Sequence, residues 1–347
     1  MYPSTVGQSW GIRCMLFSSA SAGQRFGQVT ENKSMSEHQG TFRLLTRADF
    51  DGVVCAALMK ELGLVNDIQF VDPRRMQHGE VAVTGCDMTA NLPYVPGVYL
   101  AFDHHSSEVV RVRGRSEDRF INDPSSPSAA QVIYDHFGGA KAFPNVRSEL
   151  MRAVNRADSA RFTQEEVLNP SGYPLINFLL DGRTGLSRFR SFRLSNEELL
   201  LQMVDQLRTH TAAELLLLPD LSERVRLYFE QEQYFRAQLA RCVQMHGRVA
   251  VVDQRAEERI YAGNRFMVYA LHPGVTLSMH CVPVADGAAV QFAIGRSIFN
   301  RDTKLDVGEL CLEYGGGGHA SAGTCQVLLA DAERVKAELL DRLRRES

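Results

Sequence analysis

The sequence predicts an α/β protein in which a mostly parallel, doubly wound sheet is joined by helices to a smaller α/β domain with a mixed sheet. The first observation is that short apolar runs alternate with segments of helical spacing between residues 42 and 158, as in βαβ units. The second is that the apolar runs after Arg248 follow each other closely, with a turn signal between two of them, as in hairpins.

The first sheet is expected from four apolar runs, each followed by a polar or a helical segment. We expect strands at residues 42–46, 67–71, 81–86 and 98–102. We expect helices at residues 53–62, 127–137 and 146–157. Ser125 or Ser126 would cap the second of these helices, and Gly138-Gly139 would end it.

The remaining segments predict a connector and a second sheet. Residues 159–195 contain several prolines and glycines and are expected to be irregular, whereas residues 196–242 read as helical with a break at Pro219. Further strands are expected at residues 249–252, 266–271, 277–284, 288–294 and 324–329, and a closing helix at 332–344. Asp286-Gly287 is the turn signal. We therefore divide the chain into a tail (1–40), a first domain (41–195), a helical connector (196–242) and a second domain (243–347).

The composition excludes several classes of protein. The 347 residues are 44% hydrophobic with a formal net charge of −3, so bulk charge does not attract nucleic acid. No run of about 20 apolar residues indicates a membrane span. The seven cysteines include no Cys-x-x-Cys pair, which argues against a zinc ribbon and favours a reducing compartment. We therefore expect a cytoplasmic protein without a membrane partner.

The first 34 residues are treated separately from the fold. They are rich in serine and glycine and contain no acid before Glu31, a composition with some likeness to an organelle transit peptide. The preferred interpretation is a disordered tail or an upstream-extended start, with Met35 as the working start.

Acids and histidines follow three of the expected strands. They are Asp49, Asp51, Asp87, Asp103, His104 and His105. The carboxyl ends of strands in an open α/β sheet form its ligand-binding edge, so we expect these side chains to converge. Such a group would repel itself unless it held a cation, and Mn²⁺ or Mg²⁺ prefers such ligands. Asp49 and Asp51 could alternatively decorate a helix N-terminus, Asp87 a loop, and Asp158 the end of a helix.

A glycine-rich run forms a second candidate binding element. It is Gly315-Gly316-Gly317-Gly318-His319, followed by Ala-Ser-Ala-Gly. Consecutive glycines let the backbone approach an anion closely, and His319 can donate a hydrogen bond to phosphate. Arg296, at the end of an expected strand, is a natural bidentate phosphate ligand. The alternatives are a flexible linker for the glycines and an ordinary surface position for Arg296.

These motifs, in this order, resemble the DHH phosphoesterase superfamily with its C-terminal DHH-associated domain. The resemblance spans residues 42–329 and rests on Asp49-x-Asp51-Gly52, Asp87, Asp103-His104-His105, Asp158 and the distant glycine-histidine run. It implies a metal-dependent hydrolase with one or two Mn²⁺ ions, with Mg²⁺ or Co²⁺ as alternatives.

The resemblance also implies a role for each matching residue. Asp87 would bridge two ions, Asp51, His104 and Asp158 would complete one site, and Asp49 would hold the other ion. His105 would face the scissile phosphate as general acid, and Asp103 would orient the site. Arg296 and His319, with Gly316, Gly317 and Gly318, would clamp the terminal phosphate of the substrate.

The sequence departs from this superfamily at two positions near the first acid. Many members have histidine four residues before it, where this chain has Leu45, and others have histidine or aspartate two residues before it, where this chain has Arg47. By this resemblance the first metal site lacks one ligand, so that either the ion is weakly held or water replaces the missing group. Arg47 would place a fixed positive charge nearby.

The predicted function is hydrolysis of terminal phosphoester bonds in small nucleotide-type substrates: short oligonucleotides, pAp or dinucleotides. One alternative is an exopolyphosphatase or pyrophosphatase acting on phosphoanhydrides. The other is a nucleotide-binding regulatory protein with a degraded metal site. The expected partners are a small phosphorylated or nucleotide substrate and short single-stranded nucleic acid, and a homodimer is left as an open alternative.

Overall fold

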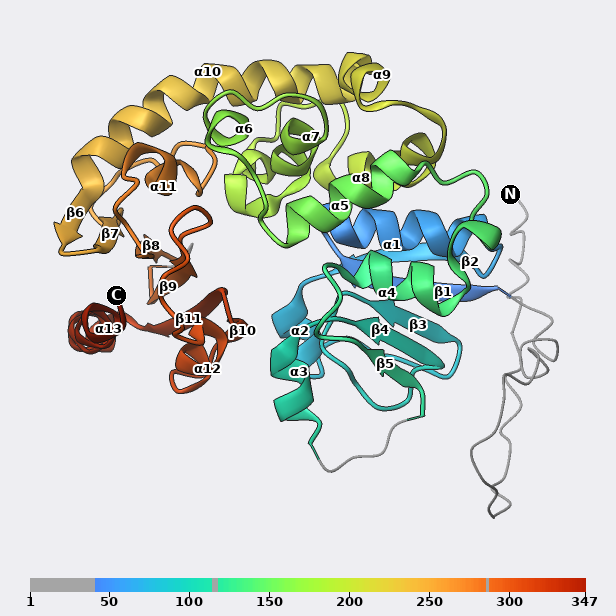
Figure 1. Ribbon diagram of the computed structural model, residues 1–347, viewed down its shortest axis with the longest axis horizontal. Coiled ribbons are helices and arrows are strands. Elements are labelled where there is room, and N and C mark those ends of the chain that lie inside the picture. Colours follow the sequence, from blue (N-terminus) through green and yellow to red (C-terminus); the bar gives the residue numbers. More distant parts are fainter. Residues whose placement is uncertain (1–40, 114–117, 285–286) are drawn as a thin grey trace, which may run out of the picture. The chain divides into compact units, whose positions relative to one another are not determined.

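The computed structural model describes residues 41–113, 118–284 and 287–347. The tail expected at residues 1–40 and the turn position Asp286 lie outside the described residues. The expected α/β class is confirmed, with one parallel sheet, one mixed sheet and helices beside both (Figure 1). Both sheets belong to one compact unit, Phe42–Ser347.

The first sheet has five parallel strands in the order β2-β1-β3-β4-β5. They are β1 (Phe42–Arg47), β2 (Val65–Val71), β3 (Asp87–Ala90), β4 (Leu100–Asp103) and β5 (Phe120–Asn122). Leu44 and Leu45 of β1 are both fully buried but belong to separate apolar clusters, because consecutive strand residues face opposite sides. Both faces of this sheet are therefore covered.

Ten α-helices precede the second sheet along the described chain. They are α1 (Phe50–Glu61), α2 (Pro73–Gln77), α3 (Ser106–Arg111), α4 (Ala129–His136), α5 (Ser148–Asp158), α6 (Gln164–Leu168), α7 (Gly172–Leu180), α8 (Asn196–Thr209), α9 (Ala212–Leu217) and α10 (Pro219–Cys242). Most of α1 is buried because it packs against β1 as well as α4, α5 and α8. Ser128 caps α4, in place of the expected Ser125 or Ser126. Among the described residues, no helix is both long enough and apolar enough to cross a membrane.

The second sheet has six strands in the order β10-β11-β9-β8-β7-β6. They are β6 (Val243–His246), β7 (Val249–Asp253), β8 (Leu277–Pro283), β9 (Ala289–Arg296), β10 (Gly317–His319) and β11 (Ala322–Leu328). Strands β7 and β8 are parallel and the other pairs are antiparallel, so the sheet is mixed as expected. Helices α11 (Met267–Leu271), α12 (Val307–Leu312) and α13 (Ala332–Glu346) accompany it.

Three local expectations are wrong. Residues 81–86 are not a strand, and β3 begins only at Asp87. Residues 267–271 form helix α11, not a strand, since a short run that is apolar throughout does not distinguish the two. The Asn264 side chain accepts a hydrogen bond from the Phe266 N–H beside the start of this helix. Residues 159–195 include helices α6 and α7.

Candidate active site

Buried polar side chains gather at the carboxyl edge of the first sheet. Asp49 and Asp51 follow β1, Asn91 follows β3, and Asp103 is the last residue of β4. The strands are parallel and in register, so their carboxyl ends lie side by side. Ligands bind at this edge in open α/β sheets.

Asp51 lies between the first turns of two helices. It belongs to the first turn of α1, and its carboxylate accepts hydrogen bonds from the N–H groups of Ala129 and Ala130 of α4, each at 2.9 Å. Both helix N-termini favour an anion at this position. One ligand atom each of Asp51, His104 and Asp158 lies within 4.8 Å of the others, so the three side chains could hold a metal ion.

His104 has the geometry of a metal ligand. Its Nδ1 lies 3.2 Å from the Ser126 carbonyl, which can only accept, so Nδ1 carries a proton, and the neutral ring that would bind a metal has its lone pair at Nε2. Nε2 is buried and makes no hydrogen bond in the described structure, although Asp158 Oδ2 lies 3.0 Å away. Two ligands that bind one ion at about 2.1 Å and at right angles lie about 3 Å apart. The donor set therefore fits a divalent cation.

The electrostatics of this group favour a cation. Burial, and then the nearby Asp158 carboxylate, raise the pKa of Asp51 to about 7. Burial opposes the ionisation of Asp158, but His104 outweighs it and holds the pKa of that carboxyl below its usual range. Burial likewise lowers the pKa of His104, yet Asp158 and the other acids raise it to about 10. Without a metal ion, these acids favour the protonated, positively charged form of His104. A bound divalent ion would supply that positive charge in its place.

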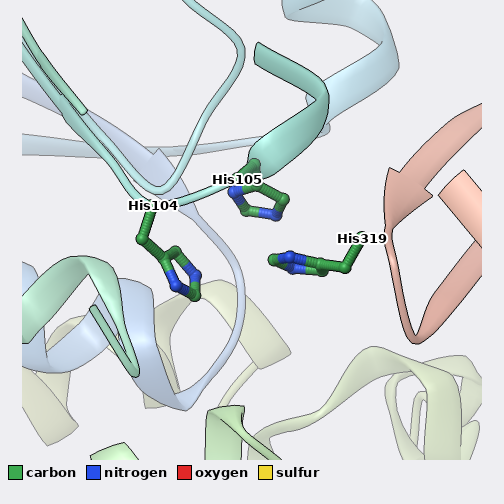
Figure 2. Close-up of side chains that lie close together, drawn as sticks. All are labelled: His104, His105 and His319. Carbon is green, nitrogen blue, oxygen red and sulfur yellow. The ribbon is translucent and has the colours of Figure 1, made fainter. Parts of the chain in front are cut away.

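Three histidines from two sheets meet beside this group (Figure 2). His105 Nδ1 donates a hydrogen bond to Asp103 Oδ1 at 2.7 Å, which leaves Nε2 for a ligand. His319 of β10 stacks on His105, with ring centroids 3.8 Å apart and an interplanar angle of 21°. The His319 and His104 rings lie 5.2 Å apart. Burial lowers the pKa of His319, and the charge of His105 lowers it further. The His319 ring is therefore neutral and carries a single N–H.

Asp49 is fully engaged by donors of this chain. Oδ1 accepts hydrogen bonds from the Gly52 N–H at 3.0 Å and from Asn91 Nδ2 at 3.1 Å. Oδ2 lies 3.0 Å from Nε of Arg47, the last residue of β1. Asp49 thus belongs to the carboxyl edge but pairs with an arginine and an amide.

Asp87 lies at the opposite end of the sheet from these acids. It begins β3 and pairs in register with Arg43, near the start of β1. Arg43 Nε donates to Asp87 Oδ1 at 2.7 Å, and the Thr84 N–H donates to Oδ2 at 2.6 Å. The three residues from Asp87 to the end of β3 span about 10 Å. A strand at residues 81–86 would end just before Asp87 and would place that acid at the carboxyl edge. Because β3 begins at Asp87, the residue at the carboxyl end of this strand is Asn91.

The glycine run packs closely on its own hairpin. A Cβ on Gly316 would lie 2.1 Å from the Thr324 carbonyl oxygen, and one on Gly318 would lie 2.2 Å from that of Ala322. Gly318 also has φ of +154°. Strand β10 pairs Gly318 with Gly323 and His319 with Ala322. The absence of side chains here therefore lets β10 approach β11 and sets the position of His319.

Replacing Gly318 with alanine is expected to destabilise this hairpin strongly. Backbone strain at positive φ costs about 1–3 kcal/mol, and the overlap with Ala322 adds to it. Differential scanning calorimetry should show a lower Tm. Gly317→Ala is the matched control, since its Cβ would meet only Leu312 Cδ2, at 3.8 Å. Equal Tm values for the two variants would contradict the packing explanation.

Arg296 lines a small cavity of about 80 Å³. Ser159, Arg301 and Ser321 also line it, and the Arg296 guanidinium donates to the Thr303 carbonyl oxygen. Ser159 directly follows Asp158 in the sequence, and Ser321 lies two residues after His319. The cavity therefore adjoins both the candidate metal group and the histidine hairpin.

A solved structure resembles this chain over almost its whole described length. The pGpG-specific phosphodiesterase PggH from Vibrio cholerae is 44% identical, with a TM-score of 0.71, over 88% of this chain and 100% of that chain. The chain belongs to the DHH phosphoesterase superfamily. The resemblance seen in the sequence is thereby confirmed.

A more distant likeness accompanies this match. An exopolyphosphatase-related protein from Bacteroides fragilis is 11% identical, with a TM-score of 0.46, over 88% of this chain and 93% of that chain. No protein-family model matches the sequence, and no curated protein matches it.

Two features of this DHH site are not predicted by the sequence patterns. Asn91 was overlooked because asparagine before Leu-Pro reads as an ordinary turn residue. The second feature is Asp181, a buried acid between Arg183 Nε at 2.7 Å and Arg265 Nη1 at 2.5 Å. Burial opposes the charged form of Arg183, but Asp181, and then Asp49, outweigh it and raise the pKa of Arg183 above its ordinary value. One acid between two arginines leaves a net positive charge near the candidate site.

Proposed function

We propose that this protein is a metal-dependent phosphodiesterase that cleaves short dinucleotides of the pGpG type into nucleoside monophosphates. The observation that carries the proposal is the group Asp51, His104 and Asp158, with His105 and His319 beside it. The identity to PggH over that protein's full length supports the same substrate class.

The proposed roles follow from the contacts of each side chain. When bound by Asp51, His104 and Asp158, a divalent ion, for which we propose Mn²⁺, would neutralise phosphoryl charge and lower the pKa of an attacking water. His105, held by Asp103, would protonate the departing 3′ oxygen through Nε2. Cleavage of that P–O bond consumes one water and releases two nucleoside monophosphates.

The second sheet would recognise the end of the substrate. His319 lies against His105, and the cavity at Arg296 adjoins Asp158 through Ser159. We therefore propose that residues 41–195 hold the metal, that residues 196–242 connect, and that residues 243–347 bind the terminal phosphate. The net positive charge around Asp181 would assist in holding the anionic substrate.

A hydrolysis panel with Mn²⁺ tests this function. The purified protein should be incubated with pGpG, pAp, a cyclic dinucleotide, polyphosphate and pyrophosphate, and the products separated by anion-exchange chromatography. We expect nucleoside monophosphate from pGpG as the fastest reaction. Release of orthophosphate from polyphosphate without cleavage of pGpG would overturn the proposal in favour of a phosphoanhydride hydrolase.

Arg296→Ala is expected to raise KM for pGpG without loss of metal. A charged hydrogen bond to phosphate contributes about 1.5–3 kcal/mol, so kcat/KM should fall about ten- to a hundred-fold. Arg296→Lys keeps the charge and should recover part of the loss. Bis-p-nitrophenyl phosphate, which lacks a terminal phosphate, should be much less affected. Equal losses on both substrates would show that Arg296 acts through the structure.

A further inference from the structure

We infer that the site binds one divalent metal ion and that Arg47 and Asn91 occupy the places of a second ion and of its bridging carboxylate. The inference deepens the proposed function and rests on it for the role of the metal. It concerns the Asp49 side of the carboxyl edge, whereas the group Asp51, His104 and Asp158 forms the other side.

The first argument is the set of donors around Asp49. Its carboxylate accepts from a backbone N–H, from the Asn91 amide and from the Arg47 guanidinium, so both oxygens already face donors. A carboxylate that binds a metal must turn at least one oxygen to the ion. Asp49 instead has the surroundings of a helix cap and an ion-pair partner.

The second argument is the charge of Arg47. Its Nε lies 3.0 Å from Asp49 Oδ2, and its side chain is 27% exposed, so the guanidinium stands at the edge of the site. An ion bound to Asp49 would lie next to this cation and would be repelled by it. Arginine remains charged at every physiological pH, so this repulsion is permanent.

The third argument is the nature of Asn91. It follows β3 directly and is held at φ of +55°, and its side chain is buried against Asp49. Because a carboxylate only accepts hydrogen bonds, the amide must present its nitrogen to Asp49. A neutral amide in this orientation cannot bridge two cations. The nearest acid of the same segment, Asp87, is paired with Arg43 at the other end of the strand.

These three features together give Arg47 a functional role. Its guanidinium supplies one fixed positive charge where a second metal would supply two, and its planar N–H groups suit phosphate oxygens. Activity should therefore depend on the Mn²⁺ concentration with a single binding step.

Metal stoichiometry tests the inference without reference to activity. The wild-type chain, saturated with Mn²⁺ and freed of excess by gel filtration, should contain one ion by inductively coupled plasma mass spectrometry. Its electron paramagnetic resonance spectrum should show an isolated Mn²⁺ without exchange coupling. Asp49→Asn, which keeps a good helix-capping residue, should also retain one ion. Two ions in the wild type, none, or loss of the ion in Asp49→Asn would each overturn the inference.

The converse variant tests the roles of Arg47 and Asn91. Arg47→His combined with Asn91→Asp should bind two ions and show exchange coupling, whereas Arg47→Lys, the matched control, should remain at one. A double variant that stays at one ion would overturn the assignment of these two residues. Cleavage of pGpG measured in parallel separates the two proposals. An active protein with two ions refutes the inference alone, and an inactive protein with one ion refutes the proposed function alone.

Discussion

Asp158→Asn is expected to lose the bound metal and to lower kcat for pGpG by about 10³-fold or more. Asp158 ends helix α5, where the helix dipole disfavours an anion, so its charge is kept by a cation and not by the helix. The asparagine side chain of the variant has nearly the same shape as the Asp158 carboxylate but carries no charge. Loss of the ion removes several kcal/mol of charge stabilisation in the transition state, and about 1.4 kcal/mol corresponds to tenfold in rate.

The metal content and kcat of this variant should be measured on the same sample. Asp135→Asn is a suitable control, because Asp135 is exposed on α4 and its carboxylate accepts a hydrogen bond from the Gln131 side-chain amide. That variant should keep both the ion and the rate. An Asp158→Asn protein with full metal content would show that Asp158 serves only as a partner of His104.

His105→Ala is expected to keep the metal and to lower kcat for pGpG by about 10²- to 10⁴-fold, the usual effect of losing a general acid. His105 is fixed by Asp103, and its free nitrogen faces the space shared with His319. The 3′ oxygen of a nucleoside is a poor leaving group unless it is protonated. Steady-state kinetics with metal analysis would measure both effects.

A substrate with a good leaving group separates this role from a structural one. p-Nitrophenolate departs without protonation, so a p-nitrophenyl ester of a nucleotide should lose much less rate than pGpG in His105→Ala. Asp103→Asn, which weakens the orientation of the ring, should give a smaller loss of the same kind. If both substrates lost rate equally, His105 would not be the acid.

Residues that carry charge in a short motif were located well from the sequence. Asp103-His104-His105 follows an apolar run, and the structure places it at the end of β4. The far-separated His319 was assigned to the same site only through the resemblance, because no local pattern records that β10 lies beside α3. Its contact with His105 is a property of the tertiary fold.

The errors have a common physical origin in short apolar segments. Residues 81–83 are apolar throughout, but the strand is the fully buried segment Asp87–Ala90, whose first residue pairs with Arg43 of β1. Because the strand begins at residue 87 and does not end at residue 86, Asp87 lies at the opposite end of the sheet from the one expected. Asn91 carried no signal, since an uncharged amide after a strand is most often part of a turn.

The order of the site residues along the chain has a consequence for synthesis. Asp51, His104 and Asp158 leave the ribosome well before His319, which follows Asp158 by about 160 residues. At roughly 5–20 residues per second, this interval lasts about 8–30 seconds. During this interval the nascent chain lacks the residue that lies against His105, and it is therefore expected to be unable to cleave its substrate.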